Sequence, residues 1–259
     1  MDQRKLYAER PGWGPDFDYD ESRHAIAYRY ASELGLGLRV LDAGCGEGFQ
    51  TQTLGDGAAS VLGVDYHAEA VETARRNCRL PNVRFAVVDL SKDSSLDERF
   101  DLVLNFQVIE HIADDRSMVA RLRSLIAPGG TLMMTTPNLL QSFSENPCHL
   151  REYTPETFAS LLRTSFDQVE ILGVFGNERV LEFDRNRRRA IERILKLDPL
   201  GIRHLLPERL LHTAFARLGQ LVRRVAHRSI GETPVTASDF RIEQGDVARA
   251  LDLVAICRV

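Results

Sequence analysis

The sequence predicts an α/β protein built on a doubly wound, mostly parallel β-sheet. Three observations carry this prediction. Short apolar runs alternate with segments of helical periodicity along the first two thirds of the chain. One apolar run passes through Asp42 into the glycine-rich stretch at residues 44–48, and the next run, at residues 61–64, ends in Asp65. A strand, a glycine loop, a helix and a second strand that ends in an acid form half of a nucleotide-binding unit, so we expect a ligand that contains a ribose.

The N-terminal 20 residues are expected to form an arm, because aromatic residues, prolines and acids are mixed there without helical or strand periodicity. Trp13, Phe17 and Tyr19 favour an arm that folds over the active site or over a partner subunit rather than a solvated tail. A helix should follow over residues 21–33, with Tyr28 on one of its faces.

Strands and helices then alternate as a doubly wound sheet requires. The Pro-Gly-Gly sequence at residues 128–130 ends the last central helix, and Thr154 with Pro155 marks the start of a later one. The expected strands of this part cover residues 38–42, 60–65, 83–88, 100–105 and 130–136, and the expected helices cover residues 48–55, 67–78 and 114–126.

Residues 178–239 are expected to form a helical insert or lid, while residues 21–177 and 240–259 form the nucleotide-binding domain. Apolar residues at helical spacing over residues 210–225, with arginines between them, predict a basic amphipathic helix. Residues 178–228 contain 13 Lys and Arg against 6 Asp and Glu, although the formal net charge of the chain is −4. Three interpretations stay open: an apolar face on the core, a surface for an anionic substrate, and contact with a membrane or RNA.

The composition is typical of a soluble enzyme. At 259 residues and 44% hydrophobic content, the chain can bury a full core. No apolar run approaches the ~20 residues that span a bilayer, and the N-terminus lacks the apolar stretch of a secretory signal. The four cysteines are scattered without a Cys-x-x-Cys pair. We therefore expect a cytoplasmic protein without a transmembrane segment, and the sequence leaves its oligomeric state open.

The sequence of the glycine loop indicates which kind of nucleotide cofactor is expected. A dinucleotide-binding loop would carry a third glycine where this chain has Phe49. The pattern Asp-x-Gly-x-Gly-x-Gly, from Asp42 to Gly48, resembles the cofactor loop of the class I S-adenosylmethionine-dependent methyltransferases. Later segments resemble that family in the same order, at residues 83–90, 100–105 and 127–132.

The resemblance implies a Rossmann-like methyltransferase sheet of seven strands. Residues 168–174 and 251–257 would then form the antiparallel pair that ends the sheet. The helical insert would lie between these two strands, before the last one.

S-adenosylmethionine is therefore the expected cofactor. The glycine backbone can approach its methionine part because no Cβ intrudes, and Asp42 suits the cationic ammonium group. Asp65 can accept both ribose hydroxyls, and Asp89 can accept from the adenine amine. The alternative for these last two acids is that they only cap the following helices. The expected cofactor-binding residues are Tyr28, Asp42, Gly44, Cys45, Gly46, Asp65, Tyr66, Asp89, Leu90 and Asn105.

The acceptor side should lie after the fourth strand and in the loop after the fifth. Residues 105–111 lack the Asn/Asp-Pro-Pro-Tyr signature of enzymes that methylate amino groups of nucleobases. They resemble the Glu-x-x-Glu-His segment of two metal-dependent O-methyltransferase groups, one of the ubiquinone pathway and one that methylates the terminal 2′-hydroxyl of small RNAs, with Gln107 in place of the first acid. Residues 149–154 resemble the His-x-x-Glu-aromatic-Thr segment of the RNA group. Both segments also resemble those of bacterial methyltransferases of glycan and natural-product pathways.

A helix that begins after the fourth strand would place Gln107, Glu110 and His111 on one face, with His149 arriving from the loop. These four residues are the candidate ligands of a divalent metal such as Mg²⁺ or Mn²⁺. Gln107 in place of a carboxylate weakens the affinity for a hard cation, which favours a metal-free mechanism. His149, or otherwise His111, is then the candidate catalytic base. A structural role for Glu110 and His111 is the third interpretation.

The sequence thus predicts an O-methyltransferase that acts on a hydroxyl of a saccharide or secondary metabolite, with a small-molecule acceptor as its partner. One alternative is 2′-O-methylation of an RNA end. Nucleic acid is disfavoured because the basic excess is confined to one segment, whereas a nucleic-acid enzyme needs a broad basic surface. The other alternative is a non-catalytic protein that binds the cofactor. The sequence does not determine the acceptor, the position methylated or the choice among O, N and C methylation.

Overall fold

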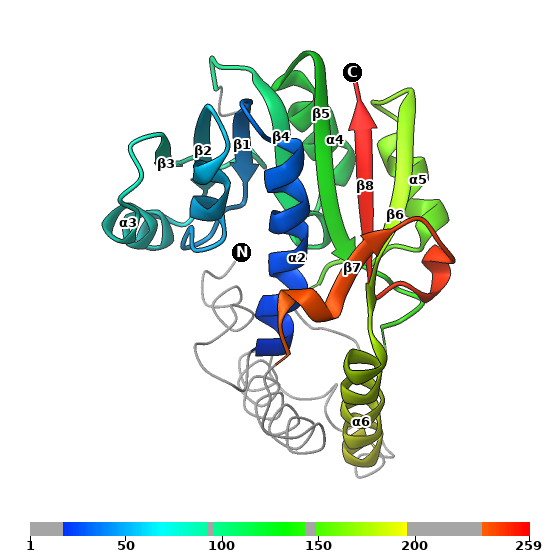
Figure 1. The fold of residues 1–259 in the computed structure, drawn as a ribbon. Coiled ribbons are helices and arrows are strands. Elements are labelled where there is room, and N and C mark those ends of the chain that lie inside the picture. Colours follow the sequence, from blue (N-terminus) through cyan, green and yellow to red (C-terminus); the bar gives the residue numbers. More distant parts are fainter. Residues whose placement is uncertain (1–17, 93–95, 143–148, 196–234) are drawn as a thin grey trace, which may run out of the picture. The chain divides into compact units, whose positions relative to one another are not determined.

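The computed structural model describes residues 18–92, 96–142, 149–195 and 235–259 (Figure 1). Its strands are β1 (Arg39–Ala43), β2 (Ser60–Asp65), β3 (Val83–Val87), β4 (Phe100–Phe106), β5 (Ile126–Pro137), β6 (Gln168–Gly176), β7 (Phe240–Glu243) and β8 (Asp252–Arg258). They form one sheet in the order β3-β2-β1-β4-β5-β8-β6-β7. The first five strands run parallel to one another, and β8 is antiparallel to both β5 and β6.

The α/β sheet predicted from the sequence is confirmed, and β6 and β8 form the expected antiparallel pair. The number of strands is corrected, because the sheet has eight strands rather than seven. The additional strand, β7, lies at the sheet edge beside β6 and has only four residues. Its alternation of Phe240 and Ile242 with exposed polar residues is too short for periodicity to separate a strand from a loop.

The helices are α2 (Asp18–Leu34), α3 (Ala68–Asn77), α4 (Asp115–Ser124), α5 (Pro155–Leu162) and α6 (Glu178–Leu195). Within the sheet domain, α3 packs against β2 and β3, and α4 packs against β5 and α5 (Figure 1). The start of α5 is as predicted, because the Thr154 side chain accepts a hydrogen bond from the Thr157 N–H and Pro155 occupies the first turn.

The helix expected over residues 48–55 is wrong in type and length. Only a 3₁₀ helix, η1 (Thr51–Asp56), forms there. Gly48 has a φ of +73°, and a Cβ on it would lie 2.6 Å from the ring of Phe85 and 2.8 Å from the Cβ of Ala74. The loop therefore passes too close to β3 and α3 for any side chain at this position, and a right-handed helix cannot include a left-handed residue.

The core is formed where helices cover both faces of the central strands. Leu41 of β1, Val103 of β4, Leu132 of β5 and Leu253 of β8 have no exposed surface and belong to one apolar cluster with Phe158 of α5. The sequences of parallel strands that are buried on both faces are continuous apolar runs. This is why the sequence located β1, β2 and β4 closely.

The chain divides into two compact units. The larger comprises His24–Gln141, Leu150–Phe175 and Ile242–Val259. The smaller comprises Met1–Arg23, Ser142–His149 and Gly176–Arg241, of which the structure describes only parts. Every helix within the described ranges is too short or too polar to cross a bilayer.

In the smaller unit, Tyr19 lies in α2 rather than in an arm and is buried against α6. Its ring stacks on Phe183 with centroids 4.4 Å apart, and it meets Phe240 edge-on at 5.7 Å. The Tyr19 hydroxyl donates to Asp184 at 3.4 Å. Trp13, Phe17 and the amphipathic segment at residues 210–225 lie outside the described residues.

Candidate cofactor site and acceptor site

The glycine loop between β1 and η1 is held by the end of β2. The Gly44 and Cys45 N–H groups both donate to the Val64 carbonyl oxygen, at 2.8 and 3.0 Å. A Cβ on Gly44, where φ is +102°, would lie 2.4 Å from Cγ2 of Val108. A Cβ on Gly46 would have no heavy atom within 4 Å. Gly44 is therefore required by a close approach to the exit of β4, whereas the space beside the Cα of Gly46 is open to an incoming ligand.

Asp65 ends β2 beside this loop, as predicted. One carboxylate oxygen accepts from the Gly46 N–H at 2.9 Å and the other accepts from the His67 N–H at 2.8 Å. Each oxygen keeps a second acceptor site. The carboxylate can therefore brace the loop and still accept the two hydroxyls of a ribose. Tyr66, directly after Asp65, is 39% exposed.

Asp89 and Leu90 follow β3, and Leu90 is buried. Oδ1 of Asp89 accepts from the N–H and the hydroxyl of Ser91, and Oδ2 pairs with Lys92 at 2.7 Å. Partial burial raises the pKa of Asp89, but the hydrogen bonds from Lys92 and Ser91 outweigh it and hold the pKa below its ordinary value. Asp89 therefore stabilises a local turn, and its contact with adenine stays a prediction.

Asp42 is completely buried beneath the loop. Its Oδ2 accepts from the Thr51 hydroxyl at 2.6 Å and from the Tyr28 hydroxyl at 3.0 Å. Its Oδ1 has no hydrogen-bond partner in the part of the chain that the structure describes. Burial raises the pKa of Asp42 to about 6, although the bonds from Thr51 and Tyr28 lower it.

Asn105, predicted as a cofactor contact, is also completely buried. Its side-chain amide donates to the Ala43 carbonyl oxygen at 2.8 Å, which joins β4 to the end of β1. This bond positions the start of the glycine loop.

The exit of β4 differs from the predicted helix. Gln107 has a left-handed backbone with φ +54°, and a 3₁₀ turn, η2 (Ile109–His111), follows it. Its amide Nε2 donates to the Thr135 hydroxyl at 3.4 Å. The expected face that joined Gln107 to Glu110 and His111 by helical spacing is therefore not formed.

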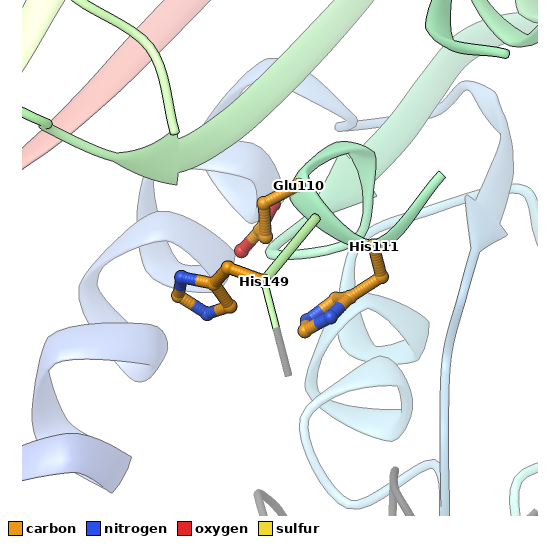
Figure 2. Close-up of side chains that lie close together, drawn as sticks. All are labelled: Glu110, His111 and His149. Atoms are coloured by element: carbon orange, nitrogen blue, oxygen red, sulfur yellow. The ribbon is translucent and has the colours of Figure 1, made fainter. Parts of the chain in front are cut away.

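Glu110, His111 and His149 nevertheless come together (Figure 2). One carboxylate oxygen and one imidazole nitrogen from each histidine all lie within 4.8 Å of one another. Glu110 is 1% exposed, and its Oε2 accepts from the Thr136 hydroxyl at 3.1 Å. His149 is fixed through the next residue, because the Leu150 N–H donates to the Glu110 carbonyl oxygen at 2.9 Å.

A second set of bonds fastens the chain after His149. The Arg151 guanidinium donates to the Ala113 carbonyl oxygen at 2.7 Å and pairs with the Asp115 carboxylate. The Tyr153 hydroxyl donates to the same carboxylate at 3.0 Å. Burial, with the adjacent Asp115 charge, raises the pKa of Tyr153 and keeps it a neutral donor.

Sequence reasoning missed four residues of this arrangement. They are Thr51, Val108, Asp115 and Thr136, which act only through contacts with distant segments. No local pattern distinguishes them from other threonines, valines and acids of the chain.

Comparison with known proteins agrees with this geometry. Residues 35–171 match the family model of a methyltransferase domain, which is more than half of the chain. The chain belongs to this methyltransferase family. A probable S-adenosylmethionine-dependent methyltransferase of Mycolicibacterium smegmatis is 35% identical over 169 residues, which cover 62% of this chain and 65% of that protein. A ubiquinone biosynthesis O-methyltransferase of Methylococcus capsulatus is 31% identical over 134 residues, or 49% of this chain and 56% of that protein.

Solved structures share the fold. The N-methyltransferase NodS from Bradyrhizobium japonicum, in complex with S-adenosyl-L-homocysteine, has a TM-score of 0.52 and 22% identity, and the match covers 66% of this chain and 89% of that one. The [4+2]-cyclase SpnF has a TM-score of 0.56 and 20% identity, and the match covers 92% of this chain and 80% of that one. A cyclase with this fold means that the fold alone does not assign the reaction.

The cofactor of this methyltransferase domain is S-adenosylmethionine, and the described residues fit it. Asp65 offers acceptors for a ribose, the space beside the Cα of Gly46 is open, and the exposed Tyr66 offers a face to adenine. The unpartnered Oδ1 of the buried Asp42 suits a cationic group on the other side of the loop.

Proposed function

We propose that the protein is an S-adenosylmethionine-dependent methyltransferase that methylates a hydroxyl oxygen of a small molecule, of the saccharide or secondary-metabolite class. The observation that carries this proposal is the cluster of Glu110, His111 and His149 at the exit of β4. Relatives named as ubiquinone O-methyltransferases support oxygen as the acceptor atom. The similarity to NodS in fold alone does not favour nitrogen.

The position of the cluster supports direct methyl transfer. Val108, which packs on Gly44 of the cofactor loop, precedes the 3₁₀ turn that carries Glu110 and His111. The cofactor loop and the acceptor side are therefore built on adjoining residues. Displacement on carbon needs donor and acceptor atoms aligned about 3–3.5 Å apart, and this alignment supplies much of the rate.

His149 is the proposed general base. Bound S-adenosylmethionine supplies a methyl group that its sulfonium has already activated. The His149 imidazole would take the proton of the acceptor hydroxyl while the oxygen gains the methyl group. The Glu110 carboxylate, within 4.8 Å of the ring nitrogen, would stabilise the imidazolium that results. His111 would contact the acceptor from the 3₁₀ turn that also carries Glu110.

A second reading of the same cluster is a divalent metal site. One carboxylate and two imidazoles are a ligand set for a first-row divalent ion, which would lower the pKa of a bound hydroxyl. Gln107 lacks the carboxylate that would make it a second acidic ligand beside Glu110, and its amide nitrogen donates to the Thr135 hydroxyl. This weakens the metal reading for a hard cation and leaves His149 essential in either case.

The test is transfer of labelled methyl groups to a panel of saccharides, glycosylated metabolites and RNA ends, with and without a chelator. Methylation of a small hydroxyl compound that survives the chelator supports the metal-free base. Activity that is lost and then restored by Mg²⁺, Mn²⁺ or Zn²⁺ supports the metal site. Transfer to the RNA end alone contradicts the small-molecule proposal. Cofactor binding without transfer to any acceptor in the panel contradicts the enzymatic reading of this site.

A further inference from the structure

The carboxylate of Asp42 is held in an asymmetric way. Two hydroxyls from different elements, Tyr28 of α2 and Thr51 of η1, donate to the same oxygen, Oδ2. The ring of Tyr28 is 6% exposed and meets Phe106 edge-on, with centroids 4.9 Å apart and an angle of 88°. The hydroxyl of Tyr28 is therefore fixed in direction by packing, and it cannot turn away from Asp42 without moving a buried ring.

The two hydroxyls oppose the effect of burial on Asp42. A buried carboxylate prefers to be protonated, because the charged form loses its hydration. Hydrogen bonds donated to a carboxylate oxygen favour the charged form, because an ionised acceptor is bonded more strongly than a neutral one. Burial of Asp42 and the nearby charge of Asp65 raise the pKa, while Thr51 and Tyr28 lower it. The pair of hydroxyls thus keeps a substantial negative charge beneath the glycine loop at neutral pH.

This charge has a defined place relative to the cofactor loop. Asp42 lies one residue before Ala43, whose carbonyl oxygen is fixed by Asn105, and two before Gly44, whose N–H is fixed by Val64. The loop therefore cannot shift easily away from the charge. Oδ1 is closed off from solvent and lacks a partner among the described residues, so its field is poorly screened.

We propose that Tyr28 and Thr51 are positioning residues that keep Asp42 ionised, and that this buried charge selects the cationic amino-acid end of the cofactor. The inference rests on S-adenosylmethionine as the cofactor. It changes the role expected for Tyr28, from a direct contact with the cofactor to a support of Asp42. It adds Thr51, which no sequence pattern indicated.

Comparing the affinities of two ligands distinguishes selection of the amino-acid end from a general disturbance of the cofactor site. S-adenosylhomocysteine carries the amino-acid part, whereas 5′-methylthioadenosine keeps the adenosine and the thioether but lacks it. Dissociation constants of both would be measured by calorimetry at pH 7.5 for Tyr28→Phe, Thr51→Val and the double variant. Tyr30→Phe in the same helix and Thr53→Val in the same 3₁₀ turn are the matched controls, because the hydroxyls that donate to Asp42 are those of Tyr28 and Thr51.

The double variant should bind S-adenosylhomocysteine about tenfold or more weakly, since a pKa raised by about 2.5 units or more leaves Asp42 mostly protonated at pH 7.5. Its affinity for methylthioadenosine and both affinities of the controls should change less than about threefold. Thr51→Ser, which keeps the hydroxyl, should restore most of the affinity that Thr51→Val loses. Its rescue keeps the test valid if the double variant folds poorly.

The pH dependence supplies a readout that loss of packing would not change. The pH at which S-adenosylhomocysteine affinity reaches half of its plateau should be higher in the double variant than in the wild type, and Asp42→Asn should show no such transition. An equal loss for both ligands, or an unchanged midpoint, would overturn the inference while the cofactor assignment stands. A wild-type protein that binds neither ligand would overturn both.

Discussion

The cofactor side and the acceptor side of this site are built in different ways. The cofactor loop is held by residues at the ends of adjacent strands, chiefly Val64 and Asp65 of β2. The acceptor side joins two segments some 40 residues apart, since Leu150 and Arg151 both donate to the Glu110 carbonyl oxygen. Cofactor binding therefore depends on the sheet itself. Acceptor chemistry depends on how a long loop is fastened to it.

The largest expected effect is a loss of turnover without a loss of cofactor affinity, when His149 on the acceptor side is replaced. His149→Ala should lower turnover by roughly 10²- to 10⁴-fold, because it removes a positioned base, or one of the metal ligands. The affinity for S-adenosylhomocysteine should stay within about threefold of the wild type. Steady-state kinetics and calorimetry measure the two quantities. Leu150→Ala is the matched control for disturbance of the loop, and full activity in His149→Ala would remove this residue from the mechanism.

The cofactor side should show its own signature in the pH dependence of stability. Asp42 has its pKa raised from 3.8 to about 6 in the folded protein, so the folded state binds more protons than the unfolded state between these values. The free energy of unfolding contributed by Asp42 is then highest below pH 4 and falls as the pH rises towards 6, by a total of about 3 kcal/mol.

The measurement is denaturant unfolding of the ligand-free wild type and of Asp42→Asn between pH 4 and pH 7. The asparagine carbonyl can still accept from both hydroxyls, but it does not titrate. The stability of the wild type relative to the variant should therefore decrease with pH over this window. A constant difference would show that Asp42 titrates alike in both states.

A third comparison concerns the ribose site. S-adenosylhomocysteine at ~100 times its dissociation constant should stabilise the wild type by about 2.7 kcal/mol, and nicotinamide dinucleotides should not stabilise it. Asp65→Ala should lose most of this gain, because the ribose hydroxyls and the Gly46 N–H lose their acceptor. Asp56→Ala, an exposed acid of η1, is the control. Thermal unfolding with each ligand makes the measurement, and equal stabilisation by a nicotinamide dinucleotide would contradict the cofactor assignment.

The sequence located β1, the glycine loop and β2 closely, because each is a short contiguous pattern. Asp42, the glycines and Asp65 form one motif, and doubly buried strands give unbroken apolar runs. The helix expected after the loop was wrong, since the left-handed Gly48 depends on the approach of Phe85. The helix predicted to begin at Gln107 was also wrong, because the sequence does not indicate a left-handed backbone there. The backbone of Gln107 is left-handed and its N–H donates to the Thr135 carbonyl oxygen of β5, a long-range contact that no local pattern indicates.

The smallest expected effects on stability and turnover compare a hydrogen bond that holds the acceptor loop with an exposed ion pair elsewhere. Tyr153→Phe removes the hydroxyl bond to Asp115 and should cost about 1 kcal/mol of stability together with a measurable fall in turnover. Arg84→Ala breaks an exposed ion pair with Glu98 and should change stability by less than about 0.5 kcal/mol and turnover not at all. Chemical denaturation and initial rates test both variants. Equal effects on turnover would contradict a role for the Asp115 contacts in holding the loop.

The contact between Gly44 and Val108 has a consequence for the order in which substrates bind. Gly44 has no space to move towards Val108, which leads directly into the turn that carries Glu110 and His111. Cofactor binding that orders the glycine loop should therefore also order the turn that carries Glu110 and His111, against which the acceptor would bind. We expect a compulsory sequence, with S-adenosylmethionine bound before the acceptor. S-adenosylhomocysteine should then inhibit competitively against S-adenosylmethionine and noncompetitively against the acceptor.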